Sequence, residues 1–295
     1  MPAPDAAAAG SGSGIAPPAP DAPPEKVEKA KDVANQAKLT PIIPSPNNPT
    51  QPAFQLYAEI DVPILATGLV FALARLTQTR PAYCAPLCSA EDKANLNPID
   101  RWVAGRYSAA WSTASDFELY GLGAATIALL IPDEGFLNML NDGVVIGEAT
   151  LSATATASVL TIAAGRPRPF LYSETAPLSV RNSADAGLSF LSSHTSEAFA
   201  IVTSLYITEK RLHPNARYPK VVLAGGLVLA SMIGVSRVAA GYHFVTDVVG
   251  GAVVGSSLGI LIGSLHGSPV QVVPVVNHDD QTRSTSAGMS FSGTF

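Results

Sequence analysis

Six apolar segments separated by polar links are the feature that most constrains what this 295-residue chain can fold into. Their apolar residues do not alternate with polar ones as in a half-buried strand, so we expect the segments to be α-helices. They cover residues 60–76, 116–132, 143–164, 194–209, 219–241 and 246–265. We therefore predict an all-α fold, in which a bundle of about six core helices forms one domain over residues 55–267.

The last two segments indicate a membrane. Val221–Ser236 and Val248–Leu265 are nearly free of charge, and they approach the ~20 residues that cross the hydrocarbon core of a bilayer. The first, second and fourth segments are shorter, and the third contains Glu148, so these four also suit the buried helices of a soluble bundle. The lengths favour a membrane-embedded body, and a soluble periplasmic bundle is the alternative.

Loop charges predict the orientation of the chain. The link from Glu209 to Lys220 contains four basic residues, which is typical of a cytoplasmic loop. Six crossings would then place Cys84, Cys88, the segment after Gly165 and the region around Gly241 on the opposite side. We expect that side to be the periplasmic face of a bacterial inner membrane. An extracytoplasmic loop favours a disulfide between the two cysteines, with two unpaired thiols as the alternative.

The two ends of the chain differ from its body. Residues 1–50 hold 11 of the 24 prolines together with Ala, Gly and Ser, a composition that predicts a disordered tail. Residues 268–295 are predicted to be a C-terminal tail, whose last residues alternate as in a β-strand, although one strand cannot close a barrel. The net charge is −5 and no run of basic residues occurs, so we expect no nucleic-acid partner.

Three clusters of polar residues follow the apolar segments. The first, Gly165–Pro169, contains two arginines after the third segment, and a guanidinium group matches phosphate oxygens, although a solvated helix exit would look similar. The second is Ser192, Ser193 and His194, where the fourth segment begins. Hydroxyls and free backbone amides at a helix start bind anions or simply cap the helix, but capping does not account for His194.

The third cluster is the most specific. It reads Ser236-Arg237, five residues, His243, three residues, Asp247. The histidine and the aspartate are four residues apart and share one helix face. A carboxylate there can bind one imidazole nitrogen and leave the other as a nucleophile. The alternative is a His/Asp pair that caps a helix.

In this order the three clusters resemble the three-part signature of the type-2 phosphatidic acid phosphatase superfamily, which includes lipid phosphatases and vanadium haloperoxidases. That signature reads Lys-x6-Arg-Pro, then Pro-Ser-Gly-His, then Ser-Arg-x5-His-x3-Asp. The third part is complete here, and the resemblance covers roughly residues 60–265. Thr161 occupies the position of the lysine, and Leu191-Ser192-Ser193-His194 lacks the proline and glycine of the second part.

The resemblance implies a mechanism. His243 would attack phosphorus to form a phosphohistidine, Asp247 would orient it, and His194 would protonate the leaving oxygen. Phosphate oxygens would be held by residues from all three clusters: Arg168, Arg237, Ser192, Ser193 and Thr161. Neither a metal nor another cofactor is implied, and the remaining histidines, His213, His266 and His278, lack the spacing of a metal site.

The expected function is therefore that of a metal-independent phosphatase, whose substrate is a phosphorylated lipid such as phosphatidic acid or an isoprenoid diphosphate, or another small phosphoester. The membrane bilayer would be its other partner, since the lipid tail could stay there while the headgroup reaches the arginines. Two alternatives remain open. One is a vanadate-dependent haloperoxidase, and the other is a catalytically impaired relative that binds phosphorylated lipid, because Thr161 leaves the site with less positive charge.

Overall fold

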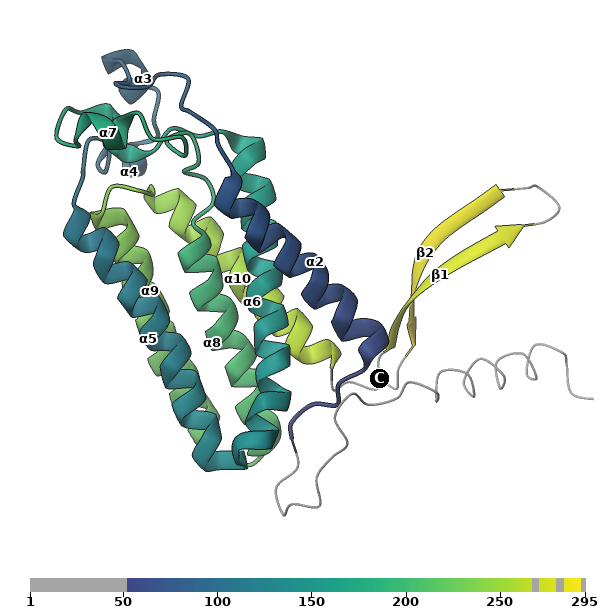
Figure 1. Ribbon diagram of the computed structural model, residues 1–295. Helices are drawn as coiled ribbons and strands as arrows, with labels where there is room; N and C mark the ends of the chain where they lie inside the picture. Colours follow the sequence, from purple (N-terminus) through teal and green to yellow (C-terminus); the bar gives the residue numbers. More distant parts are fainter. Residues whose placement is uncertain (1–51, 267–270, 280–283, 293–295) are drawn as a thin grey trace, which may run out of the picture. The chain divides into compact units, whose positions relative to one another are not determined.

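The computed structural model describes residues 52–266, 271–279 and 284–292. Six long helices make up the body of this part (Figure 1): α2 (Ala58–Thr77), α5 (Ala109–Glu134), α6 (Phe136–Ala164), α8 (Ser193–Leu212), α9 (Tyr218–Ala239) and α10 (Val245–Leu265). Each corresponds to one of the six predicted segments, although α9 ends two residues before its segment does, so the helical bundle is confirmed. The tail predicted for residues 1–50 lies outside the described residues.

Short helices gather at one end of the bundle, where Figure 1 shows α3 (Ala90–Ala94), α4 (Pro98–Arg101) and α7 (Leu178–Arg181). Local sequence starts two of them, because Ser89 forms a capping box before α3 and Asn97 caps α4 ahead of a proline. The 3-10 turn η1 (Pro169–Tyr172) is fully buried. Its aromatic residues pack with Phe244 in one apolar cluster. This packing connects the link after α6 to the start of α10.

Glycines let α10 approach α8 closely. Gly251, Gly255 and Gly259 lie four residues apart on the face of α10 that meets α8. A Cβ atom at Gly255 would lie 2.1 Å from the backbone carbonyl oxygen of Ser196 in α8, so a larger residue does not fit. Small residues at such a crossing allow two backbones to pack directly. The first turns of α8 and α10, which carry site residues, are therefore held at a short distance.

In the part of the chain that the structure describes, four helical segments are long and apolar enough to cross a membrane: Ala109–Glu134, Phe136–Tyr172, Tyr218–Ala239 and Val245–Leu265. Much of their apolar surface faces outward. In α9, for example, Val221, Val228 and Val235 repeat at seven-residue intervals and are each more than 60% exposed. An apolar outer face of this length suits contact with lipid. The body is accordingly that of a membrane protein.

The C-terminal region contains a β-hairpin. Strand β1 (Gln271–Asp279) pairs antiparallel with β2 (Ser284–Ser292). The valine-rich sequence of β1 and the alternation in β2 favour extended backbone. The region predicted as a C-terminal tail therefore departs, in its described parts, from the helical structure of the body.

Candidate active site

His243 lies in the short link between α9 and α10 and is almost completely buried. The chain turns there at Gly241, whose φ is +77° and where a Cβ atom would lie 1.9 Å from the carbonyl oxygen of Arg106, so only glycine fits. The Nδ1 atom of His243 lies 2.6 Å from the backbone carbonyl oxygen of Ser189. A carbonyl can only accept, so Nδ1 carries the hydrogen, and in the neutral ring Nε2 carries the lone pair.

Burial and the neighbouring positive charges keep the imidazole of His243 neutral. Burial is the largest effect, and together with the positive charges of Arg237 and Arg168 it lowers the pKa of His243 well below the ordinary value. His194 acts in the same direction, while the hydrogen bond with Ser189 opposes it. The structure thus brings both predicted histidines and both predicted arginines into one electrostatic neighbourhood.

Arg168 and Arg237 flank the ring of Tyr242, with their Cζ atoms 4.8 and 4.9 Å from its centre. Arg168 is held by Asp185, since Nε donates to the carbonyl oxygen at 3.0 Å and Nη2 to the carboxylate at 2.9 Å. Its Nη1 is buried and has no hydrogen-bond partner among the described residues. Arg237 donates from Nη1 to the hydroxyl of Ser115 at 3.0 Å. Both guanidinium groups are fixed before any anion binds.

His194 is the second residue of α8, and its Nε2 lies 2.8 Å from Oδ1 of Asp116 in α5. Ser192 is the N-cap residue, and Ser193 begins the helix; both are buried. The hydroxyl of Ser192 lies 2.9 Å from that of Thr195. Amides in the first turn of an α-helix have no acceptor within the helix and attract anions. The second predicted cluster therefore sits at a helix terminus suited to phosphate.

Asp247 does not bind His243 directly, because its Oδ2 atom is 4.0 Å from Nδ1. The carboxylate instead accepts hydrogen bonds from the Ser189 hydroxyl at 2.6 Å, the Phe244 amide at 2.8 Å and Nη1 of Arg166 at 2.5 Å. Ser189 thus stands between the two residues: its hydroxyl binds Asp247 and its carbonyl binds His243. The direct hydrogen bond expected from the sequence is replaced by this relay.

Arg166 is bound to two carboxylates. Its Nη2 donates to Asp100 at 2.8 Å, its Nη1 donates to Asp247, and its Cζ lies 4.1 Å from the ring centre of Phe244. Burial alone would raise the pKa of Asp100, but hydrogen bonds from Arg166 and Thr246 outweigh burial and lower it. Arg166 therefore links two carboxylates and does not replace the missing lysine.

Thr161, in the lysine position, is completely buried. Its hydroxyl donates to the carbonyl of Ala157 at 2.5 Å and accepts from the amide of Leu191 at 3.2 Å. These bonds attach the segment before α8 to the end of α6. Thr161 thus contributes backbone anchoring in the structure, whereas the resemblance implied phosphate binding.

Several residues of the site were not predicted: Ser115, Asp116, Asp185 and Ser189. Asp116 and Ser115 anchor His194 and Arg237 from α5. A signal was present, since Asp116 and Glu118 are acidic residues at the start of a mostly apolar segment. Cys84 and Cys88, away from these residues in sequence, are joined by a disulfide.

Comparison with known proteins gives one family and one solved structure. The model of the PAP2 superfamily matches residues 142–268, which include Thr161, His194 and Asp247. The solved structure is described as the first transmembrane PAP2 type phosphatidylglycerolphosphate phosphatase, from Bacillus subtilis. It is 23% identical, covers 68% of this chain and 93% of its own, and superposes with a TM-score of 0.41. No curated protein matches.

Proposed function

We propose, from the match of residues 142–268 to the PAP2 superfamily model, that the chain is a phosphatase that hydrolyses a phosphomonoester or diphosphate of a lipid through a phosphohistidine intermediate. The observation that carries the proposal is the state of His243. Its Nδ1–H is held by the carbonyl of Ser189, and its Nε2 makes no hydrogen bond within the described residues. A neutral, oriented imidazole is the form that attacks phosphorus.

In the first step, the Nε2 lone pair of His243 forms a bond to phosphorus while the bond from phosphorus to the ester oxygen breaks. The leaving oxygen takes a proton from His194, whose charged form is stabilised by Asp116 at 2.8 Å. Asp247 acts through Ser189, because its carboxylate holds the hydroxyl of the residue that orients His243. The nucleophile is thus positioned by two residues in series.

In the second step, water attacks the phosphohistidine and gives a proton to His194, which now acts as a base. The bond between Nε2 and phosphorus breaks, phosphate leaves, and His243 returns to its neutral state. Each proton taken in one step is returned in the other, so no net charge stays in the site. The covalent intermediate divides one difficult displacement into two easier ones.

Charge on the phosphoryl oxygens is offset by the two buried guanidinium groups. Nη1 of Arg168 is buried without a partner among the described residues, so an oxygen of the substrate would satisfy it. The first-turn amides of α8 at Ser193 and His194 supply further donors. Fixed donors of this kind stabilise charge that develops in the transition state without reorganising.

The substrate class follows from the surroundings of the site. The site lies at one end of helices whose length and apolar faces suit a bilayer. A lipid phosphate or an isoprenoid diphosphate could keep its tail in the membrane and present its phosphate to Arg168 and Arg237. Lipid phosphates are therefore the substrates to test first.

Phosphate release from short-chain lipid phosphates, measured with the purified protein in detergent, tests the proposal. We expect turnover by the wild type and a loss of about 10³-fold or more for His243→Gln, because the nucleophile is removed. His213→Gln is the matched control, since His213 lies in the link after α8 and pairs with Asp133. It should retain full activity.

Other results would favour the alternatives. Retained binding of lipid phosphates without turnover of any of them would identify a binding protein. Oxidation of bromide that depends on added vanadate would identify a haloperoxidase. Equal activity of wild type and His243→Gln would rule out a phosphohistidine at this position.

A further inference from the structure

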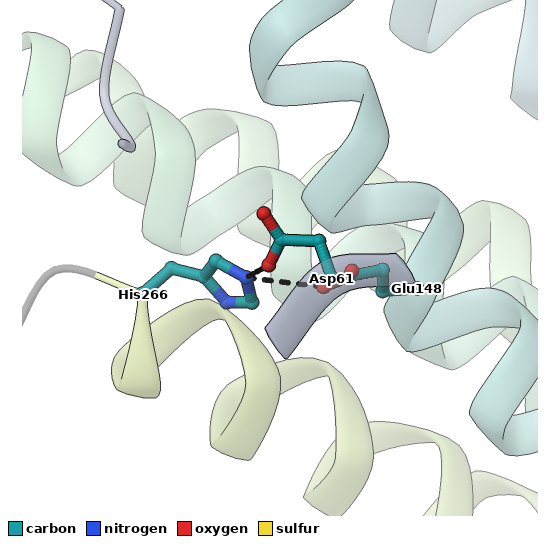
Figure 2. A group of neighbouring side chains, drawn as sticks. All are labelled: Asp61, Glu148 and His266. Atoms are coloured by element: carbon teal, nitrogen blue, oxygen red, sulfur yellow. Dashed lines mark hydrogen bonds and ion pairs between the residues drawn. The ribbon is translucent and has the colours of Figure 1, made fainter. Parts of the chain in front are cut away.

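His266, Asp61 and Glu148 meet in a second buried cluster, which the phosphatase mechanism does not use. His266 follows the last turn of α10, Asp61 lies near the start of α2, and Glu148 lies in α6 (Figure 2). Along α10 the cluster is about 28 Å from Asp247, at 1.5 Å per residue. From this arrangement we propose that the three side chains form a binding site for a divalent transition-metal ion such as Zn²⁺, separate from the active site.

The donor atoms converge. Nε2 of His266 lies 2.8 Å from Oδ1 of Asp61 and 3.1 Å from Oε2 of Glu148. Both carboxylate side chains are completely buried, and the His266 side chain is 5% exposed. Figure 2 shows both carboxylates directed at the same edge of the imidazole ring. One ligand atom from each residue lies within 4.8 Å of the others. Ligands of a tetrahedral zinc ion are about 3.4 Å apart for bonds of ~2.1 Å, so small side-chain adjustments suffice.

The hydrogen bonds around the cluster orient its side chains as metal ligands are usually oriented. Nδ1 of His266 lies 3.0 Å from the carbonyl oxygen of Ile262, so Nδ1 carries the hydrogen and Nε2 is the atom turned toward the carboxylates. Histidines that bind metals usually donate their other N–H to such a carbonyl. Asp61 is oriented in a similar way, because its Oδ2 accepts from the amide of Tyr57 at 2.5 Å.

Glu148 provides a second, independent observation. The Nε2 atom of His266 lies within ion-pair distance of both carboxylates, but hydrogen-bond geometry is met toward only one of them. That one is Asp61, and neither carboxylate oxygen of Glu148 has a partner with hydrogen-bond geometry among the described residues. Glu148 is fully buried, and an ionised group without such a partner is costly there. Its carboxylate is thus aimed into the cluster with coordination capacity unused.

A divalent cation would balance the charges of the cluster. Two carboxylates and a protonated imidazole leave one net negative charge in a buried site. Two carboxylates, a neutral imidazole and a divalent ion sum to zero. One imidazole and two carboxylates are a donor set that suits zinc and related first-row metals, whereas calcium takes six to eight oxygen ligands.

Such an ion would join α2 to the rest of the bundle. Asp61 is contributed by α2, and the other two ligands by α6 and α10. Binding energy at a site that exists only in the folded protein adds to folding stability. We expect the metal to strengthen the attachment of α2 and to leave the chemistry at His243 unchanged.

Zinc binding to the chelator-treated protein in detergent tests the site, with bound zinc measured by mass spectrometry and by calorimetry. The parent protein should carry His213→Ala, because Asp133, Glu209 and His213 form another cluster of metal-ligand type. We expect one zinc ion per chain and a rise in the unfolding temperature on adding Zn²⁺. Glu148→Gln and His266→Gln should each weaken binding at least tenfold.

Two outcomes would overturn the proposal. One is a parent protein that binds no zinc and whose unfolding temperature does not respond to Zn²⁺. The other is unchanged zinc affinity in both Glu148→Gln and His266→Gln, which would place the bound ion elsewhere. The test does not measure phosphate release by the parent. Failure of the metal-site proposal and failure of the proposed function are therefore distinguishable.

Discussion

At the scale of single residues, His243, the proposed nucleophile, is held in place by groups behind its ring. Ser189 holds Nδ1 of His243 through its carbonyl oxygen at 2.6 Å, and Asp247 holds the hydroxyl of Ser189 at the same distance. Arg166 in turn pairs with Asp247 and Asp100. This chain of contacts replaces the simple His/Asp pair that the four-residue spacing indicated.

The depressed pKa of His243 predicts how stability depends on pH. An unfolded histidine titrates near pH 6.5, whereas burial and the arginines lower the pKa of the folded residue well below that value. Below pH 6.5 the unfolded chain therefore binds a proton that the folded chain excludes. Stability should fall as the pH drops, by at most about 1.4 kcal/mol per pH unit, and this contribution should be fully present above pH 6.5.

Unfolding temperatures in detergent between pH 7.5 and pH 4.5 measure this effect. His243→Gln should show a shallower decline below pH 6.5 than the wild type, since its side chain takes up no proton. The same slope in both proteins would mean that the folded and unfolded forms of His243 titrate alike.

At the scale of the elements, the site depends on how closely α8 and α10 pack. His194 stands in the first turn of α8, and Asp247 stands in the first turn of α10. The glycines of α10 permit the approach, and the backbone of α8 occupies the space where their side chains would be. The distance between these helices therefore sets the distance between the second and third clusters.

Gly255→Ala should disturb this packing. The new Cβ would lie 2.1 Å from the carbonyl oxygen of Ser196, so the helices must separate, at a cost of about 1–3 kcal/mol. We expect a lower unfolding temperature and reduced phosphate release. Gly225→Ala in α9 is the matched control, because nothing lies within 4 Å of its Cβ position, and alanine favours a helix by roughly 0.5–1 kcal/mol. Equal effects of the two substitutions would contradict this account.

At the scale of the whole molecule, the two ends of the bundle differ in chemistry. One end holds the link between α9 and α10 with the short helices α3, α4 and α7, while the link between α8 and α9 lies at the other end (Figure 1). His243 belongs to the first of these links. That link contains Lys210, Arg211, Arg217 and Lys220. The positive-inside rule relates such a link to the cytoplasm. The site would then face the periplasm.

Labelling of introduced cysteines checks this orientation. Asn182, next to α7, and Asn215, in the basic link, are both exposed. On intact cells a membrane-impermeant maleimide should label Asn182→Cys directly and Asn215→Cys only after permeabilisation. The native cysteines are joined in a disulfide in the structure, and the unsubstituted protein serves as the blank. Labelling of Asn215→Cys alone on intact cells would reverse the predicted orientation.

The amino-acid sequence by itself determined the positions of the six long helices and the order of the three polar clusters. Both are local properties. An apolar segment has to place its surface in a protein core or in lipid wherever it lies in the fold, and the motif from Ser236 to Asp247 lies within one stretch of chain. The β-hairpin was indicated only weakly, by the alternation near the C-terminus.

Only the tertiary structure decided which atoms meet. The placement of Ser189 between His243 and Asp247, the partnership of His194 with Asp116, and the direction of Arg166 all depend on links packing against distant helices. The cluster at His266 is the clearest case, because Asp61 is 205 positions away in the chain. Contacts of this kind arise from the packing of α2, α6 and α10, and no spacing along the sequence encodes them.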